Sequence, residues 1–312
     1  MYDKVKLWTV RTRATPDVSK FLDRAKDQID HETGEVCTFG SLGGLKVSIY
    51  TSGISIVGSL AKFLYPNNIY PLDRYTTAQA IEKLADSLHF SLGDAKVTGL
   101  EFGTQFVMVH PVENYLSRLG DMPKLQRYHF NAGTLYYKPR GKQQSKVFVF
   151  YDKKADAAAK GMALPAGFDE ANLLKYEMRL NGRLPQRLGI PEVLASTLSE
   201  KSFYRLMVKR YQEYYFAISK LPQIETGGIM SQIKTVSDAF DVLVAQLINR
   251  SDPILIMAFL DELKEAKVFC DRKCYSRLKK KIQEISAKVV LETSNELIKE
   301  LDDDIKNIGA YI

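Results

Sequence analysis

One alternating stretch decides the fold class: Lys96-Val97-Thr98-Gly99-Leu100-Glu101-Phe102-Gly103-Thr104-Gln105-Phe106-Val107-Met108. Because successive side chains of a strand point to opposite faces, its apolar residues make one buried side and its polar residues an open side. The open side carries Glu101, with Gly99 and Gly103 as its neighbours on the same face. Glycines weaken a strand and are accepted where another backbone or a ligand comes close. The stretch therefore predicts a half-buried strand whose open face is the floor of a site.

A second stretch has the same design: Leu173-Leu174-Lys175-Tyr176-Glu177-Met178-Arg179-Leu180-Asn181. Its polar side carries Lys175, Glu177 and Arg179, and its other side is apolar and aromatic. Two carboxylates, Glu101 and Glu177, on the open face of one sheet can hold a divalent cation through oxygen ligands, and the flanking basic residues can bind phosphate. The alternative is an exposed sheet face with cross-strand ion pairs, which is the commoner arrangement.

The strand predicted between these two, at residues 145–151, ends in Tyr151 and is followed at once by charged residues. A tyrosine at a strand end beside a metal can act as a nucleophile, because the cation and nearby lysines favour the phenolate. The alternative is a boundary residue with a packed ring and a hydrated hydroxyl. The chain has 17 tyrosines, so chance alone supplies such a position.

The pattern changes character near residues 181–191, from strands with turns to helices. Strands are expected at residues 4–13, 45–50, 54–58, 96–108, 134–138, 145–151 and 173–181. Helices are expected at residues 76–90, 202–219, 229–249, 253–269, 275–291 and 294–308. We therefore predict an α+β protein with an antiparallel-sheet domain over residues 1–200 and a helical C-terminal domain over residues 201–312.

Composition is that of a globular protein, with 45% hydrophobic residues, a net charge of +7 and a pI near 9.0. The positive charge favours a polyanionic partner. The mixed N-terminal residues and the lack of a long apolar run predict a cytoplasmic protein without a membrane partner. Cys37, Cys270 and Cys274 are an odd number, so no disulfide framework is expected, and the pair Cys270 and Cys274 has no second pair and no histidine close in sequence, so no zinc site is expected.

Three segments in this order resemble the phage and plasmid replication proteins of the gene II/X family, as known from filamentous phages. The segments are Leu100-Glu101-Phe102, then Val149-Phe150-Tyr151-Asp152-Lys153, then Leu174-Lys175-Tyr176-Glu177-Met178-Arg179. A fourth, Ser59-Leu60-Ala61-Lys62-Phe63-Leu64-Tyr65-Pro66-Asn67-Asn68, is similar to a family stretch with Ser, Ala-Lys and a terminal Asn at those spacings. The similarity covers roughly residues 45–190.

The resemblance implies an HUH-like replication nuclease with Tyr151 as nucleophile and Lys153 near the scissile phosphate. It further implies Mg²⁺ or Mn²⁺ near Glu101 and Glu177, and DNA contacts from the residues Lys62, Asn68, Lys175 and Arg179. The chain departs from the family at Gly99, where a basic residue is usual, and at Glu101, where an Asp is usual. No two histidines stand one residue apart, so the histidine pair of many rolling-circle nucleases is absent.

The function implied is rolling-circle initiation: a nick in one DNA strand that leaves a 5′-phosphotyrosine and a free 3′-hydroxyl. The implied partners are single-stranded or supercoiled origin DNA and the host helicase and polymerase, in the cytoplasm of a bacterial host. Two alternatives stay open, a DNA-binding protein without catalysis and an assembly protein built on the helical tail. Tyr204, Tyr211 and Tyr215, near one helical face, are the alternative nucleophiles, although an aromatic packing stripe is the commoner reading of such spacing.

Overall fold

The computed structural model describes residues 1–65, 67–141, 144–168, 170–221, 223–224, 233–251, 253–287, 291–292 and 296–308. The chain forms two compact units, one of Met1–Ser219 with Glu300–Ile312 and the other of Lys220–Lys299. The division therefore follows Ser219 rather than residue 200, and the chain returns to the first unit at its end. The physical reason is that the helix after residue 200 packs on the sheet.

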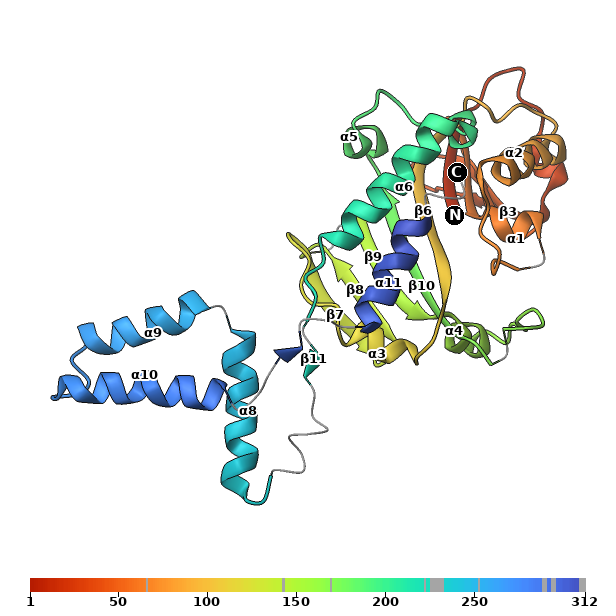
Figure 1. Ribbon diagram of the computed structural model, residues 1–312. Coiled ribbons are helices and arrows are strands. Elements are labelled where there is room, and N and C mark those ends of the chain that lie inside the picture. Colours follow the sequence, from red (N-terminus) through yellow and green to blue (C-terminus); the bar gives the residue numbers. More distant parts are fainter. Residues whose placement is uncertain are drawn as a thin grey trace. The chain divides into compact units, whose positions relative to one another are not determined.

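The first unit is built on one large antiparallel sheet (Figure 1). Its strands are β1 (Tyr2–Val10), β2 (Asp23–Ile29), β3 (Val36–Leu42), β4 (Leu45–Ile49), β5 (Gly53–Ser59), β6 (Lys96–Met108), β7 (Gln126–Asn131), β8 (Thr134–Lys138), β9 (Lys146–Asp152) and β10 (Asn172–Asn181). The order across the sheet is β2-β3-β4-β5-β1-β6-β10-β9-β8-β7. The predicted α+β class is confirmed, and the two acid-bearing strands β6 and β10 are neighbours in the middle.

Helix α6 (Lys201–Phe216) covers one face of the central strands, as Figure 1 shows. The apolar side chains of these strands lie beneath it: the Tyr211 ring of α6 is 4.2 Å from the Tyr176 ring of β10, and the Tyr211 hydroxyl donates to the Tyr176 carbonyl at 2.9 Å. From Glu300 on, α11 (Glu296–Asn307) belongs to the same unit, and its Asp302 accepts a hydrogen bond from Tyr215. The polar residues of β6 and β10 therefore face the other side of the sheet.

The remaining helices of this unit are short, except for α2. They are α1 (Leu60–Leu64), α2 (Arg74–Leu88), α3 (Val112–Leu116), α4 (Lys153–Ala159) and α5 (Leu184–Leu188), with 3₁₀ turns at Val18–Phe21 and Ser196–Ser199. Helix α2 begins two residues before the predicted start, because Asp73 caps it in a capping box with Thr76.

The second unit contains helices α8 (Val236–Arg250), α9 (Pro253–Glu265) and α10 (Arg272–Ser286), with the short strands β11 (Gln223–Ile224) and β12 (Leu291–Glu292). The predicted helix over residues 229–249 begins only at Val236, after the Thr235 cap, and its first residues, 229–232, lie outside the described part. Among the described residues no single helix is long and apolar enough to cross a membrane. One pair, Val236–Asn249 with Ile254–Glu265, bent by 106°, meets the length and composition criteria together.

Candidate active site

The pairing of β10 with its two neighbours brings the predicted residues onto one open face. Arg179 pairs with Glu101, Glu177 with Gly103, and Lys175 with Tyr151. Residues directly opposite each other in antiparallel strands point to the same side. A side chain on Gly103 would meet the Tyr176 carbonyl at 2.2 Å, so glycine is needed there to let β10 approach. Glu101, Tyr151 and Glu177 therefore share the face that α6 leaves open.

The end of β9 explains why a tyrosine and a lysine two residues apart reach the same place. Tyr151 is the last residue but one of the strand, and Asp152 caps α4 by accepting a hydrogen bond from the Ala155 amide at 2.9 Å. Lys153 is then the first residue of α4, and its side chain is buried. Its Nζ donates to the Asn68 Oδ1 at 3.2 Å. The strand end, cap and helix start thus place Tyr151 and Lys153 around one site.

Glu177 is the acceptor for the Tyr151 hydroxyl. The Tyr151 hydroxyl donates to Glu177 Oε1 at 2.8 Å, and Lys175 Nζ lies 3.3 Å from the same oxygen. Arg179 donates to the other oxygen through Nε at 3.0 Å and Nη2 at 2.6 Å. Glu177 is only 3% exposed, so its charge is held inside the protein by these donors.

Asp3 also belongs to this site, although no sequence motif predicted it. This residue of β1 is buried, and its Oδ2 lies 3.3 Å from Lys175 Nζ. Asn68 donates to the same oxygen at 2.8 Å, and the Ser59 hydroxyl donates to Oδ1. A register shift in the pairing of β1 with β6 falls between Tyr2 and Val5, at this residue. Asp3 thereby connects the Glu177 side of the site to the Asn68–Lys153 side.

A signal for Asp3 existed in the sequence. It is an acid near the start of an otherwise apolar-alternating strand, and the segment from Ser59 to Asn68 supplies two of its three hydrogen-bond donors, the third being Lys175. The spacing of Ser59 and Asn68 in that segment is therefore explained by a shared carboxylate on a distant strand. Sequence alone gives no indication that the two segments meet.

Burial and charge shift the pKa values of the group in opposite directions. Burial works to raise the pKa of Glu177, but Lys175 and Arg179 outweigh it and lower the pKa. Burial also works to raise the pKa of Asp3, but the charge of Lys175 and the hydrogen bonds from Ser59 and Asn68 outweigh it and lower the pKa. Burial and the neighbouring Glu177 charge raise the pKa of Tyr151 far above its usual value. At neutral pH Tyr151 is a neutral donor and Glu177 an ionised acceptor.

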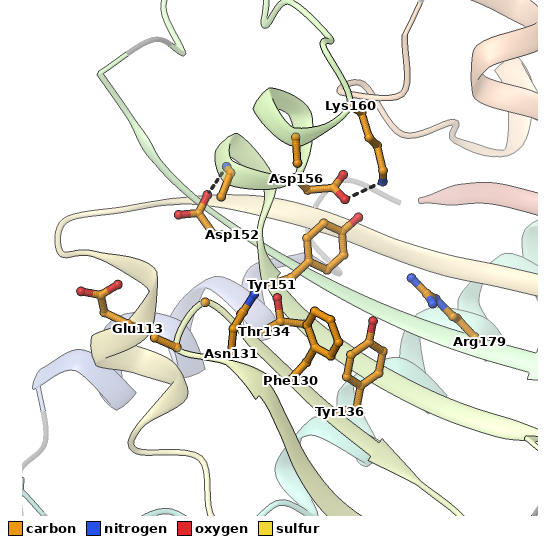
Figure 2. Close-up of a pocket in the computed structure, with 14 residues that line it drawn as sticks. Glu113, Phe130, Asn131, Thr134, Tyr136, Tyr151, Asp152, Asp156, Lys160 and Arg179 are labelled. Atoms are coloured by element: carbon orange, nitrogen blue, oxygen red, sulfur yellow. Dashed lines mark hydrogen bonds and ion pairs between the residues drawn. The ribbon is translucent and has the colours of Figure 1, made fainter.

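Tyr151 stands where two surface hollows meet. One, of about 690 Å³, is lined by residues of β7, β8 and α4, and Figure 2 shows Tyr151 within it between Asp156 and Lys160 on one side and Phe130 and Tyr136 on the other. The other, of about 530 Å³, extends over β1, β6 and β10. The two share the residues Tyr151, Asp156, Lys160 and Arg179. A chain-like ligand crossing both hollows would pass the Tyr151 hydroxyl.

The predicted DNA contacts divide into two groups. Lys62, Asn68 and Arg179 line the second hollow, as do Lys153 and Glu101. Lys175 does not line either hollow: it is 1% exposed and lies between Asp3 and Glu177. Its contact with DNA stays a prediction. In this arrangement two carboxylates enclose its ammonium group, which holds them in place.

The alternative tyrosines lie on the opposite, helix-covered face. Tyr211 and Tyr215 are fully buried and Tyr204 is nearly so. Tyr215 donates to Asp302 at 2.7 Å, and the Tyr204 ring packs edge-on against Phe102. These tyrosines form the core between α6 and the sheet, which confirms the packing interpretation.

The residues of this site could hold a divalent ion only together with oxygen atoms of a bound substrate. The described residues contain no group of three or more His, Cys, Asp or Glu placed to hold a metal. Glu177 has both oxygens engaged, but Glu101 lies 3.6 Å from Lys4 and 3.8 Å from Arg179, beyond hydrogen-bond distance. Burial raises the pKa of Glu101 despite Arg179, so its charge is incompletely offset. Mg²⁺ commonly takes one or two carboxylates with substrate phosphates and water, and Glu101 suits that role.

Acid should destabilise this cluster in a way that depends on Asp3. A group whose folded pKa is lowered adds stability above its unfolded pKa, near 4, and that stability is lost as the pH falls through the folded value. Asp3 and Glu177 have lowered pKa values, whereas the raised pKa of Glu101 acts in the opposite sense. Asp3→Asn should cost about 3 kcal/mol at neutral pH, because Lys175 loses a buried partner. The cost should shrink below about pH 4.

Urea unfolding followed by the fluorescence of Trp8, the only tryptophan and part of the first unit, measures this difference. The matched control is Asp17→Asn, an exposed acid paired with Lys20 on the surface, which should leave the unfolding free energy nearly unchanged. A difference between wild type and Asp3→Asn that stays constant down to about pH 3 would show that Asp3 carries no lowered pKa.

No known protein family matches the sequence, and no curated protein matches it. Among solved structures, a rolling circle replication initiator protein from Geobacillus stearothermophilus is similar over 69% of this chain and 84% of its own, with 11% identity and a TM-score of 0.37. The di-domain ARO/CYC protein BexL from the BE-7585A biosynthetic pathway is similar over 62% of this chain and 77% of its own, with 13% identity and a TM-score of 0.20. Neither similarity is high enough to assign the chain to a family.

Proposed function

We propose that the protein is an HUH-like rolling-circle replication initiator that nicks one strand of origin DNA with Tyr151 and stays joined to the 5′ end. The observation that carries this proposal is the contact between the Tyr151 hydroxyl and the buried Glu177 carboxylate, at the meeting point of two hollows with basic lining residues. A hydroxyl bound to an ionised acceptor beside an anion site is the arrangement that a nucleophile requires. The resemblance of the ordered segments to the gene II/X family supports the same reaction.

In the proposed step the Tyr151 oxygen attacks the scissile phosphorus while its proton passes to Glu177. The bond between phosphorus and the 3′-oxygen breaks, and that oxygen takes a proton from water and leaves as a 3′-hydroxyl, while Glu177 later returns its proton to solvent. One phosphate ester replaces another, so the step needs no nucleotide and is reversible. Reversal joins the strand again. The free 3′-hydroxyl is the end that a host polymerase would extend, with a host helicase as a further partner.

Cationic side chains around Tyr151 supply the charge that a phosphate needs. Lys153, Lys62 and Arg179 line the hollow that contains Glu101. When a phosphate enters, Arg179 can turn from Glu177 to it, and Glu177 then loses two hydrogen bonds that lower its pKa. Glu177 thereby becomes a stronger base at the moment when the Tyr151 proton must move.

The ion, Mg²⁺ or Mn²⁺, is proposed to be held by Glu101 and the scissile phosphate. Bound there it would polarise the phosphate towards attack. Glu101→Gln should raise the Mg²⁺ concentration for half-maximal nicking by about tenfold or more, because the neutral amide no longer offsets the cation. Mn²⁺ binding to the Tyr151→Phe variant with uncleaved DNA, followed by electron paramagnetic resonance, should weaken in parallel when Glu101→Gln is added.

Glu213→Gln is the matched control, since Glu213 is a surface acid of α6 that pairs with Lys209 and Arg210 on the helix-covered side. Metal titrations that coincide for wild type and Glu101→Gln would assign Glu101 a structural role in binding Lys4 and Arg179.

The proposal is tested by incubating the protein with a randomised pool of single-stranded oligonucleotides and Mg²⁺ or Mn²⁺, and with supercoiled DNA carrying its own gene. Cleaved strands should carry a 3′-hydroxyl. A DNA-binding protein without catalysis, the second candidate, would retain the oligonucleotides but leave every strand intact with either ion.

A further inference from the structure

Three aromatic side chains form a cluster on the sheet away from Tyr151. Trp8 is on β1, Phe39 is on β3, and Tyr50 follows β4. The Trp8 and Tyr50 ring centroids are 5.9 Å apart, and those of Phe39 and Tyr50 are 6.3 Å apart. Phe39 is 36% exposed, and Trp8 and Tyr50 are partly exposed. The cluster is therefore accessible from solvent.

The strand register places Trp8 and Phe39 at the two ends of one cross-strand row on the open face, and the Tyr50 ring lies beside this row, within 5.9 Å of the Trp8 ring and 6.3 Å of the Phe39 ring. Trp8 pairs with Ser55, Ser55 with Ser48, and Ser48 with Phe39. Two serines, whose side chains are small, thus lie between the aromatic residues at the two ends of the row. The residues on either side of Ser55 in β5, Ile54 and Ile56, point to the opposite face of the sheet and are buried there.

The neighbouring row carries positive charge. Lys6 pairs with Val57, and Val57 pairs with Lys46, so this row runs parallel to the aromatic one. Lys6 and Lys46 line the same hollow as Tyr151. In the sequences of β1, β3, β4 and β5 the acidic residue is Asp3 alone, and it is buried within the site. The open face of these four strands is therefore basic, and it continues the hollow.

The Trp8 ring lies against Gly53. A side chain on Gly53 would meet the Trp8 ring at 2.5 Å, so the indole occupies the space above Gly53 that a side chain would fill. Trp8 lies four residues along β1 from Lys4, a distance of roughly 13 Å at the usual rise of a strand. The span from the Glu101–Lys4 pair to the indole is that of a few nucleotides.

We propose that the cluster of Trp8, Tyr50 and Phe39 is a base-stacking platform for the single-stranded DNA whose phosphate is bound at Tyr151, which rests on the proposed function. Lys6 and Lys46 bind the phosphates between the two places, and the aromatic rings bind the bases that follow. Aromatic rings beside a basic track are the common means of holding single-stranded DNA, because every base has a face that stacks. Bases inside a duplex are already stacked, so the platform selects single strands.

Trp8 itself reports on this proposal, because it is the only tryptophan of the chain. Oligothymidylate is added to the Tyr151→Phe variant, which cannot cut it, and the tryptophan emission is recorded. We expect saturable quenching that weakens at high salt, and little quenching by a duplex of equal length. Emission that stays unchanged while fluorescence anisotropy shows the labelled oligonucleotide bound would overturn the platform.

Substitutions test the same point without relying on emission. Phe39→Leu and Trp8→Leu should each weaken the binding of oligothymidylate by at least about fivefold, while Trp8→Phe restores part of the affinity. The matched control is Phe216→Leu, an exposed aromatic residue of α6 on the helix-covered side. Equal affinities for Phe39→Leu, Trp8→Leu, the control and wild type would also overturn the proposal.

The outcome is separable from that of the proposed function. Strand cleavage by wild type without quenching of Trp8 refutes the platform and leaves the nuclease standing. Quenching with no cleavage at any ion concentration refutes the nuclease and supports a single-strand binding face.

Discussion

Tyr151→Phe should abolish both nicking and the covalent protein-DNA adduct while leaving the affinity for single-stranded DNA within about twofold. The substitution removes the attacking oxygen and nothing else of the ring, so the rate should fall by at least about 10⁴-fold, as when other nucleophiles are removed. Glu177 loses one hydrogen bond and keeps its contacts with Lys175 and Arg179, so the fold should persist. Rates are measured on end-labelled single strands, and affinity by anisotropy of the same strands.

Tyr75→Phe is the matched control, because Tyr75 is an exposed tyrosine of α2 outside both hollows. It should cut at the wild-type rate. Adduct formation by Tyr151→Phe at more than a trace would move the nucleophile elsewhere and remove the main support for the proposed reaction.

Glu177→Gln should lower the nicking rate by about 10²- to 10⁴-fold, the usual effect of losing a proton acceptor. A readout other than rate separates this role from a structural one. Without Glu177 the proton of Tyr151 must go to solvent, and burial, the largest cause of the raised pKa of Tyr151, is retained in the variant. The residual rate of Glu177→Gln should therefore rise about tenfold with each pH unit between about pH 7 and about pH 9, whereas the wild-type rate stays nearly level.

The same substitution removes the charge that Lys175 and Arg179 share, so a loss of roughly 3 kcal/mol in unfolding free energy is expected as well. Glu177→Asp keeps the charge with a shorter reach, and should recover stability better than it recovers rate. If Glu177→Gln and wild type have parallel pH profiles, Glu177 only positions Lys175 and Arg179.

The central part of the sheet and the candidate site could be predicted from the sequence because β6 and β10 alternate strongly and each carries a central acid. Their half-buried faces fix both strand type and side, since a slip by one residue would put the apolar side chains in water. Gly103, on the open face, predicted that a backbone or a ligand comes close to β6, and the close neighbour is the backbone of β10. The alternating pattern therefore predicts both the central strands and the face of the sheet on which Glu101 and Glu177 lie.

The edges of the sheet could not be predicted in this way. Every residue of β2 is exposed, and β7 is nearly so, so neither has the buried side that produces an alternating pattern. Their pairing depends on backbone hydrogen bonds to β3 and β8, which leave no trace in side-chain type. The role of Asp3 was missed for a related reason, because its partners come from two other parts of the chain, Ser59 and Asn68 from one segment and Lys175 from β10.

The most direct test of the account is the identity of the DNA end that becomes attached to the protein. A single-stranded substrate is labelled either at its 3′ end or at its 5′ end, incubated with protein and Mg²⁺ or Mn²⁺, and separated on a denaturing gel, and the adduct is digested for peptide mass analysis. Attack by Tyr151 with loss of the 3′-oxygen predicts that the 3′ label, and not the 5′ label, migrates with the protein, on the peptide that contains Tyr151. Migration of the 5′ label, attachment to another residue, or cleaved strands with no adduct would contradict it.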